Sequence, residues 1–392
     1  MPEKAASRAR KIVNEGDILY STVRPYLHNM CIIDREFSRE AIASTGFAVL
    51  KCCADYSNEF LFYYMMSPDF DSYANDTANS KGVAYPAIND ERLSMALVPI
   101  PPVSEQRRIL KQLLEILPTI QMYDITHQRL EKLNDTFPAQ LKKSILQDAV
   151  QGKLVLQDPA DEPASALLER IRAEKEQLIK EGKIKRDKHE SVIFRRDNSY
   201  YEKVDEIERC IDDELPFEIP ESWEWCRLKS LTENITSGSR DWAKYYSTTG
   251  AAFLRMGNLS KNSFDLRLEH IQRVSIPSKA EGTRTSLQSG DLLFSITGDV
   301  GMLGLIPDGF EKAYINQHTA MIRFLPEMRN KYIPYLLLTD YAQKFYNANQ
   351  HGIKNSFRLD SIGELLVSIP PEKELFRILQ RISLVLSKIA VL

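Results

Sequence analysis

Two stretches that lie far apart in the chain are nearly the same. Residues 15–21 read EGDILYS, and residues 289–295 read SGDLLFS. In each, a glycine–aspartate pair typical of a turn precedes apolar residues that favour a β-strand. A second related pair follows in the same order: VPIPPVSEQRRIL (98–110) and VSIPPEKELFRIL (367–379). Because the spacing between the copies is nearly constant, the sequence predicts a duplicated structural unit.

Each copy mixes strand and helix patterns. Stretches such as DLLFSITG (291–298) and YINQHTAMIRFLP (314–326) are rich in residues that favour strands and are interrupted by turn residues. Residues 58–76 and their counterpart 331–349 suit short helices. The second copy also has an earlier half, from Pro216 to Gly290, that has no counterpart in the first. We therefore expect an α+β protein with two mixed α/β units, the first of them partial.

Long helices are expected to follow the Pro-Pro pairs. After the first pair, Ser104 is a candidate N-cap, and apolar residues then recur at helical spacing to Val150. Pro118 and Pro138 should kink or restart this helix, and Gly152 should end it. Another helix is expected between Pro163 and Gly182. The helix after the second Pro-Pro pair presents an apolar face (Leu375, Ile378, Leu379 and Ile382) that needs a partner, for which the helix after residue 104 is the natural candidate.

The composition limits which classes of protein this chain can belong to. The 392 residues are 43% hydrophobic, but they hold no apolar run near the eighteen residues of a membrane helix, and the N-terminus has no apolar signal region. The five cysteines fit no disulfide framework, so we expect a reduced, cytoplasmic protein. The net charge of −3 does not indicate nucleic-acid binding by itself, although a local basic face can exist within it. The mixed-charge run KEGKIKRDKHE (180–190) is either a solvated linker or a basic DNA-binding arm.

The ordered set of motifs resembles the specificity subunit of a type I restriction-modification enzyme. The stretches IPPVSEQRRIL and IPPEKELFRIL are similar to the family's exit from each target-recognition domain. The stretches LKKSILQDAVQGKLV (141–155) and DEPASALLERIRAEKEQLIKEGKIKR (161–186) are similar to its central conserved region. LPFEIPESWEWCRL (215–228) resembles the start of a second recognition domain, and YINQHTAMIRF a strand inside it.

The resemblance implies an architecture of two recognition domains separated by long antiparallel coiled-coil-like helices. The expected boundaries are the C-terminal part of a first target-recognition domain at 1–103, a central helical spacer and linker at 104–190, a linker at 191–214, a second target-recognition domain at 215–371, and the start of a distal helix at 372–392. Compared with the family, the first domain lacks its N-terminal half and the distal helical region is short.

The resemblance also implies function. A specificity subunit performs no chemistry: each recognition domain reads one half of a split DNA target, and the paired helices hold the domains apart and dock the modification subunits. No cofactor is then expected in this chain. The partner subunits are expected to bind the cofactors, which are S-adenosylmethionine for adenine methylation, and ATP and Mg for the restriction subunit. A chain with one whole recognition domain could also associate with a copy of itself.

DNA contact residues are expected in polar loops, because phosphates are bound by Lys, Arg and backbone N–H groups and bases by Arg, Asn, Gln and Ser. Residues 222–370 carry more basic than acidic residues, whereas 1–103 carry more acidic ones, so the second unit is the better candidate reader. The candidates there are Arg240, Lys244, Arg255, Asn258, Lys261, Gln350, Lys354, Asn355 and Arg358, and in the first unit they are Asn79, Ser80, Lys81 and Tyr85. Asn316, Gln317 and His318 could serve readout or only internal hydrogen bonding.

Two other functions stay open from the sequence. The chain could be a scaffold that binds partners through its helices without reading DNA, or the product of a silent recombination cassette. An enzyme has the least support, because the sequence contains no GxxxxGK[ST], GxGxxG, HExxH or [DNS]PP[YF] motif. The histidines His270, His318 and His351 have no spacing typical of a metal site.

Overall fold

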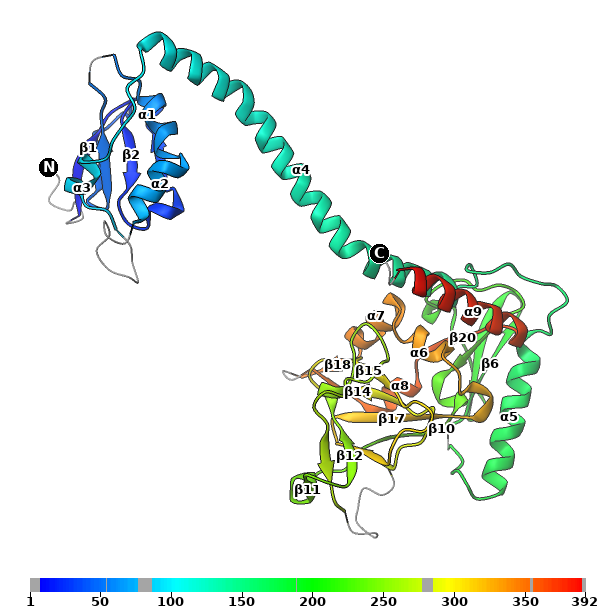
Figure 1. Ribbon diagram of the computed structural model, residues 1–392. Helices are drawn as coiled ribbons and strands as arrows, with labels where there is room; N and C mark the ends of the chain where they lie inside the picture. Colours follow the sequence, from blue (N-terminus) through cyan, green and yellow to red (C-terminus); the bar gives the residue numbers. More distant parts are fainter. Residues whose placement is uncertain are drawn as a thin grey trace. The chain divides into compact units, whose positions relative to one another are not determined.

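The computed structural model describes residues 8–53, 55–76, 87–187, 189–276, 285–352 and 355–389. The chain divides into two compact units, Met1–Lys132 and Leu133–Leu392, with the boundary inside one long helix. Both units combine helices with mainly antiparallel sheets (Figure 1), which confirms the predicted α+β class. No helix among the described residues contains a stretch that is long and apolar enough to span a bilayer.

Unit 1 contains two small sheets and a set of short helices. The strands are β1 (Ala9–Val13), β2 (Ile18–Ser21), β3 (Met30–Ile32), β4 (Ala41–Ser44) and β5 (Phe47–Leu50). β1 pairs with β4, and β2 lies between β3 and β5, all antiparallel. The helices are α1 (Asn58–Met65), α2 (Pro68–Asn75), α3 (Asp90–Ser94) and the first part of α4 (Val103–Val150). Ser57, Ser67 and Asn89 cap α1, α2 and α3 through their side-chain oxygens, as their residue types favour.

Unit 2 is larger and begins with the last part of α4. Its other helices are α5 (Ala164–Lys180), α6 (Tyr332–Leu336), α7 (Asp340–Ala348), α8 (Leu359–Gly363) and α9 (Glu372–Ile389). One sheet has the order β10 (Thr232–Ser237), β17 (Thr319–Phe324), β14 (Leu292–Ser295), β15 (Leu303–Leu305). A second has the order β11 (Tyr246–Ser247), β13 (Gln272–Val274), β12 (Ala251–Leu254), β16 (Ala313–Ile315), in which β12 and β16 are parallel. Unit 2 also contains two strand pairs, β9 (Glu224–Arg227) with β20 (Leu366–Ile369), and β18 (Gln350–His351) with β19 (Ser356–Phe357).

The two matching heptapeptides fold alike. Gly16 and Gly290 both have positive φ, +85° and +81°, the left-handed region that glycine tolerates and other residues avoid. The following aspartate accepts a hydrogen bond from the backbone three residues before it, Asn14 N in unit 1 (2.9 Å) and Gln288 N in unit 2 (2.8 Å). The strands β2 and β14 then each occupy an inner position between two antiparallel neighbours. The sequence repeat therefore corresponds to one structural motif that is present in both units.

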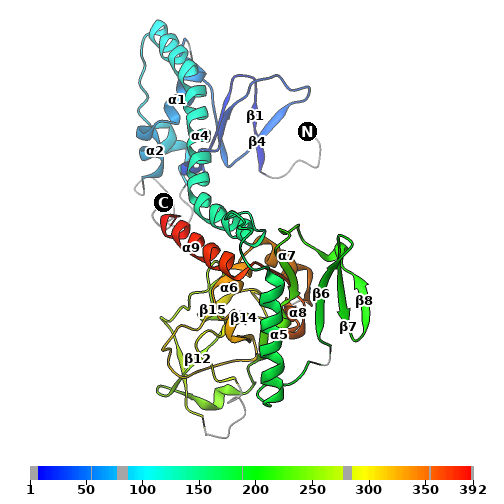
Figure 2. The ribbon, with the colours of Figure 1, turned by 90° about the vertical axis from the view of Figure 1, so that its right-hand side faces the viewer.

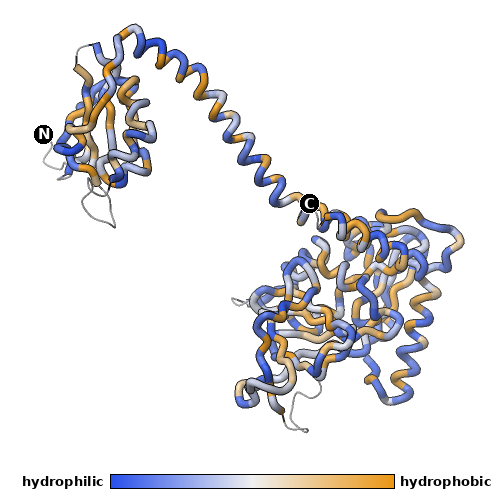
Figure 3. The backbone as a smooth tube through the Cα atoms, in the orientation of Figure 1, coloured by the Kyte–Doolittle hydropathy of each residue, from blue (hydrophilic) through white to orange (hydrophobic). Residues whose placement is uncertain are grey.

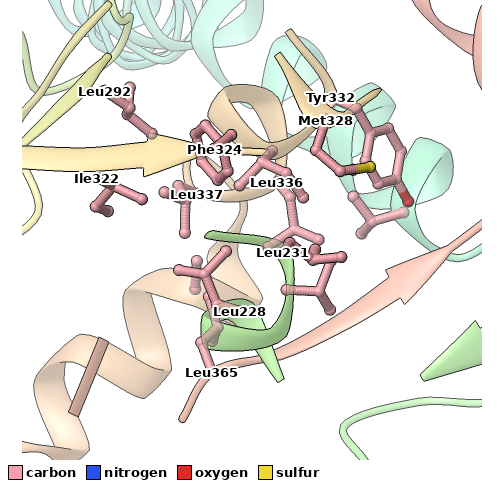
Figure 4. Close-up of a cluster of buried hydrophobic side chains, with 14 of the residues drawn as sticks. Leu228, Leu231, Leu292, Ile322, Phe324, Met328, Tyr332, Leu336, Leu337 and Leu365 are labelled. Atoms are coloured by element: carbon pink, nitrogen blue, oxygen red, sulfur yellow. The ribbon is translucent and has the colours of Figure 1, made fainter. Parts of the chain in front are cut away.

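The main core of unit 2 joins the helices to the sheets. Figure 4 shows part of it, where Leu228 and Leu231 meet Phe324, Leu336 and Leu365. The same cluster includes α4 residues Leu146, Ala149 and Val150, α5 residues Leu167, Leu168 and Ile171, and α9 residues Leu375, Ile378 and Ile382. The apolar face of α9 is therefore buried in the same cluster as the last turns of α4 and part of α5, and α9 lies beside the end of α4 in Figures 1 and 2. Burial of these side chains stabilises unit 2 because it removes apolar surface from water.

The course of α4 differs from the prediction in two ways. The helix begins at Val103, so Ser104 lies within its first turn and is not the N-cap. It also runs without interruption through Pro118 and Pro138. A proline removes one backbone hydrogen bond, and the residues on either side keep theirs, so a long helix can continue past it. The expected stop is present, since Gly152 has a φ of +70° just beyond the last turn.

The stretch 191–214, expected as a linker, is instead a folded sheet. Its strands β6 (Ser191–Arg196), β7 (Ser199–Val204) and β8 (Ile207–Cys210) form an antiparallel meander (Figure 2). Both connections have two residues with positive φ, Asp197-Asn198 and Asp205-Glu206, as two-residue hairpins require. Ile193 and Ile211 pack on Trp225 of β9 in a cluster of their own. The family resemblance implied a linker here, but the alternating apolar residues of the stretch bury one face of the sheet.

Candidate nucleic-acid interface

Four polar segments of unit 2 surround one cleft of about 640 Å³. Residues 255–258 follow β12, and residues 267–270 precede β13. Thr297 and Gly298 follow β14, while Asn316 and His318 lie between β16 and β17. Every segment is a loop at a strand end, where side chains can reach outward from a rigid sheet. The cleft is lined by Arg255, Met256, Gly257, Asn258, Arg267, Glu269, His270, Thr297, Gly298, Asn316 and His318.

Asn258 holds two of these segments together. Its side chain is 4% exposed. Its Oδ1 accepts a hydrogen bond from Arg255 N (3.0 Å), and its Nδ2 donates to Arg267 O (2.9 Å) and to His270 O (3.4 Å). The predicted contact residue Asn258 therefore has its amide committed to loop structure, and it positions the neighbouring Arg255 and Arg267.

His318 lies at the rim within a small hydrogen-bonded group. Its Nδ1 is 2.8 Å from Thr297 Oγ1, and its Nε2 is 2.9 Å from Gln317 Nε2. The backbone N–H of His318 donates to Asn316 Oδ1 (3.2 Å), which also accepts from the Thr319 hydroxyl (3.2 Å). Residues 316–318 are therefore hydrogen-bonded to one another and to their neighbours, and Asn316 and His318 also line the cleft; their role in base readout stays a prediction. The imidazole remains exposed, although both of its nitrogens are within hydrogen-bond distance of neighbouring side chains.

A glycine brings the loop after β10 against this rim. Gly238 approaches so closely that a Cβ atom there would lie 2.1 Å from Ile315 O and 2.4 Å from Asn316 O. The next residue, Ser239, forms a parallel bridge with Asn316. Its hydroxyl is buried and hydrogen-bonds to no atom of the described residues. The predicted contact residue Arg240 follows directly and is exposed, so the 238–240 loop extends the polar surface of the cleft.

The hairpin β18–β19 borders the cleft on another side. Thr297 forms an antiparallel bridge with Ser356, and Phe357 N donates to Ile296 O (2.8 Å). Three predicted residues belong to this segment: Gln350 bonds Asn347 (3.5 Å), Asn355 has a φ of +45°, and Arg358 is exposed ahead of α8. Lys354 lies outside the described residues. Of the residues predicted in unit 2, Arg255 and Asn258 line this cleft, and the segments that carry Arg240 and Asn355 reach its rim through one bridge each.

Two predicted cations lie on neighbouring surfaces. Lys244 extends over the ring of Tyr245, 5.1 Å from its centroid. Lys261 is 3.8 Å from the Asp299 carboxylate and lines a second hollow with Lys142 and Lys143 of α4. Lys142 donates to Asn262 O (2.6 Å), and burial lowers the pKa of its amine, although nearby Asp265 acts in the opposite direction. The candidates Asn79, Ser80, Lys81 and Tyr85 of unit 1 all fall outside the described residues.

Sequence reasoning missed part of the lining. The sequence does not single out Arg267, Glu269 or Thr297 as DNA contacts, and His270 stands out only as a histidine without the spacing of a metal site. In sequence, residues 267–270 are an alternating charged and apolar stretch with no glycine or repeat to mark them. The side-chain amide of Asn258 donates to two carbonyls of this stretch, and Arg267 N donates to Asn258 O (2.9 Å), which together bring the stretch to the cleft. The turn Thr297-Gly298 could have been found, because it follows the repeated strand motif directly.

The known proteins to which this chain is similar all come from one family. The sequence model described as "Type I restriction modification DNA specificity domain" matches residues 5–135. The specificity subunit of the Escherichia coli type I restriction enzyme EcoAI is 31% identical over 289 residues, covering 62% of this chain and 45% of that protein. The E. coli EcoEI specificity subunit is 30% identical over 241 residues, covering 59% and 37%. The chain thus spans less than half the length of these curated relatives.

A solved structure shares the fold. The crystal structure of the HsdS subunit from Thermoanaerobacter tengcongensis superposes with a TM-score of 0.53 at 21% identity, covering 99% of this chain and 78% of that one. A structure from a study of assembly and conformational transition of the type I R-M system gives a TM-score of 0.50, also at 21% identity, with the same two coverages. At such identities the likeness concerns the fold.

Proposed function

Because the chain belongs to the specificity subunits of type I restriction-modification enzymes, we propose that it recognises a DNA sequence for partner subunits that carry out the reaction. In this proposal unit 2 contains a target-recognition domain at 215–371, and the cleft bordered by residues 255–258, 267–270, 297–298 and 316–318 reads base edges. The observation that carries the proposal is that the predicted loop with Arg255 and Asn258 lines the cleft, while the segments that carry Arg240 and Asn355 reach its rim through the bridges Ser239–Asn316 and Thr297–Ser356. The chain itself performs no catalytic step, and S-adenosylmethionine, ATP and Mg belong to the partners.

The lining supplies both kinds of hydrogen-bonding group that base edges need. Arg255 and Arg267 present the forked donors that suit the acceptors of guanine, and Glu269 presents an acceptor that suits the amino group of cytosine. His318, Asn316 and Arg240 border the same surface. The bonds from Asn258 to the backbone of Arg255, Arg267 and His270 fix the two arginine-bearing loops before DNA arrives, so little ordering is needed on binding.

Selection from a random duplex library, with and without the modification subunit, tests this function. We expect one enriched motif, with an affinity that falls steeply as salt rises because bound phosphates release counterions. Arg255→Ala and Arg267→Ala should each relax preference at particular base pairs, at a cost of about 1–3 kcal/mol for the preferred sequence. The control Arg381→Ala removes an exposed cation of α9 away from the cleft and should leave preference unchanged. Equal loss on all sequences for both cleft variants would contradict base readout there.

We further propose that α4 is the docking helix for the modification subunit. Apolar side chains recur every seven residues along it, and all are exposed: Ile109, Ile116, Tyr123, Leu130 and Phe137. Figure 3 shows apolar positions returning at intervals along this helix. A seven-residue apolar repeat is the pattern that packs against a partner helix. The scaffold alternative uses the same surface and differs only in lacking DNA readout.

Substitution on and off this seam tests the docking. Ile116→Asp places a charge in the apolar seam and should abolish co-purification with the modification subunit. Gln121→Asp, an exposed position outside the seven-residue repeat, should leave co-purification intact. If both variants behave alike, the seam is not the docking surface.

A further inference from the structure

The second hollow of unit 2 has a volume of about 430 Å³ and lies between α4 and the loops that continue from the cleft. Three lysines from two parts of the chain line it. Lys142 and Lys143 belong to the last part of α4, and Lys261 belongs to the loop that follows the cleft residues 255–258. The end of the long helix therefore shares one hollow with a loop that also carries cleft residues.

Two loops connect the cleft to this hollow, each over three residues. Asn258 lines the cleft and Lys261 the hollow, while Gly298 lines the cleft and Gly301 the hollow. Three residues of chain span at most about 11 Å. The major groove of DNA is about 12 Å wide, with base edges inside it and a phosphate backbone along each rim. A duplex whose base edges meet the cleft thus brings backbone phosphates within reach of the hollow.

The three lysines differ in whether a carboxylate neutralises them. The Nζ atoms of Lys143 and Lys261 lie 3.0 Å and 3.8 Å from aspartate oxygens. Lys142 forms no ion pair with a residue that the structure describes, and its Nζ donates to Asn262 O (2.6 Å), which uses one of three N–H groups. The side chain is half-buried, and burial lowers the pKa of its amine more than the charge of Asp265 raises it. A half-buried ammonium group without a counter-charge is costly, and a bound anion would remove that cost.

The wall formed by α7 adds a neutral donor. Asn347 lines the hollow, and its Oδ1 accepts from Gln343 Nε2 (3.2 Å) and from Gln350 Nε2 (3.5 Å). Within the described ranges its Nδ2 donates to no other residue, so two N–H groups remain for the oxygen atoms of a ligand. Lysine ammonium groups and side-chain amides are the donors with which proteins bind the phosphates of DNA.

We propose that this hollow binds one backbone phosphate of the DNA whose bases the cleft reads, with Lys142 and Lys261 as its cationic contacts and Asn347 as a neutral contact. The end of α4 is then part of the DNA-binding surface, in addition to its proposed docking role. The inference rests on the proposed function, because it takes the cleft as the place where bases are read. The two differ in their consequences, since a phosphate contact strengthens binding to every sequence and a base contact favours particular ones.

Duplex affinity of the full-length chain with its modification subunit, measured at several salt concentrations, tests the site. Lys142→Gln and Lys261→Gln should each reduce the salt slope by about one and weaken binding about fivefold at about 0.15 M salt, equally for a preferred and a scrambled duplex. Lys142→Arg keeps the charge, so its slope should match that of the wild type. The matched control Lys373→Gln removes an exposed lysine of α9 outside the hollow and should change neither affinity nor slope. Tryptophan fluorescence of each variant establishes that unit 2 is folded.

Labelling of lysines with an acylating reagent locates the phosphate without a substitution. Added duplex should slow the labelling of Lys142 and Lys261 and leave that of Lys373 unchanged. Inorganic phosphate at the same total phosphate concentration should protect none of the three, because a single free phosphate lacks the other contacts that hold the duplex. Equal protection by inorganic phosphate and by duplex would identify a site for free phosphate and would overturn the proposal.

The salt slope and the sequence preference separate this inference from the proposed function. Wild-type slopes in both Lys142→Gln and Lys261→Gln would overturn the phosphate site, even if Arg255→Ala still shifts the preference and so supports base readout. A reduced slope in both variants, together with a wild-type chain that prefers no sequence, would support the phosphate site and contradict readout by the cleft. A changed preference at an unchanged slope in Lys142→Gln would mean that Lys142 only positions the loop through Asn262, which would also overturn the proposal.

Discussion

Arg323 donates two parallel hydrogen bonds to the buried carboxylate of Asp291, from Nε to Oδ1 (2.7 Å) and from Nη2 to Oδ2 (2.6 Å). The side chain of Asp291 is 1% exposed, so its charge is held inside the protein by this pair. The hydrogen bond to Asp291 raises the pKa of Arg323 further above its ordinary value, against the effect of burial. The repeated Gly-Asp turn is thereby tied to the strand next to it in unit 2.

The matching pair in unit 1 is weaker, which leads to the first prediction. There Lys51 takes the place of Arg323, and its Nζ lies 3.6 Å from Asp17 Oδ1, which accepts no hydrogen bond from any residue that the structure describes. Lys51→Arg should supply the missing donors and stabilise unit 1 by about 1 kcal/mol. Hydrogen exchange of the β2 and β5 amides measures this, since slower exchange reports the local gain. The exposed pair Lys111–Glu115 provides a control, because Lys111→Arg should change nothing; unaltered β2 exchange in Lys51→Arg would contradict the inference.

The second prediction concerns Gly238. An added Cβ would meet two backbone carbonyl oxygens, so Gly238→Ala must push the 238–240 loop away from residues 315–316. We expect loss of sequence preference in DNA selection with unit 2 still folded, because the strain is confined to a loop at the cleft rim. Gly257→Ala is the comparison, since a Cβ at Gly257 has no atom within 4 Å. Equal thermal stability and equal preference in the two variants would show that the close approach has no role.

The repeat illustrates which parts of the fold could be predicted from the sequence. The turn residues Gly16 and Gly290 and the pattern after them depend on local chemistry, so their structure followed from seven residues. The boundaries of α5 likewise followed from Pro163 and Gly182. By contrast, Pro118 and Pro138 are local signals that the long-range stability of a 48-residue helix overrides.

The cleft was also predictable only in part, because local sequence signals do not show which distant segments meet. Arg240, Arg255 and Arg358 were found because polar loops are visible in sequence. Which loops meet depends on contacts between distant residues, such as the bridges Ser239–Asn316 and Thr297–Ser356. Asn258 illustrates the limit: an asparagine suited to base readout was indistinguishable in sequence from one that ties two loops together.

The third prediction tests the packing of α9. Ile378 is fully buried in the cluster that includes Leu146 and Val150 of α4, so Ile378→Ala should lower the free energy of unfolding of unit 2 by about 2–5 kcal/mol. Phe376 lies two residues earlier on the same helix and is 62% exposed. Phe376→Ala should therefore cost about 0.5 kcal/mol or less. Denaturant titration followed by tryptophan fluorescence reports on unit 2, because all three tryptophans, Trp223, Trp225 and Trp242, are in it. Similar losses in the two variants would mean that α9 is not anchored by this face.

The last prediction is a pH dependence that originates at Glu202 of β7. This carboxylate, 2% exposed, accepts from Ser191 Oγ (2.5 Å) and from Arg227 Nε and Nη2 (both 2.8 Å), and so joins the β6–β8 sheet to β9. Burial acts to raise its pKa, but the hydrogen bonds from Arg227, Ser191 and Arg209 outweigh burial and lower the pKa to about 2. The folded state thus binds the proton less well than the unfolded state, whose pKa is near 4.5.

The sign of the effect follows from that difference. Stability from Glu202 is fully present above pH 4.5 and is lost as the pH falls from there toward 2, by up to about 3 kcal/mol. Glu202→Gln removes the titrating group, so the variant should be less stable at pH 7, because Arg227 then lacks a buried counter-charge, and the gap to wild type should narrow below pH 4.5. Urea unfolding at pH 7, 5, 4 and 3 gives both curves. Glu206→Gln, at an exposed turn between β7 and β8, controls for general charge effects. A gap between wild type and Glu202→Gln that stays constant from pH 7 to 3 would show that this carboxylate does not titrate with folding.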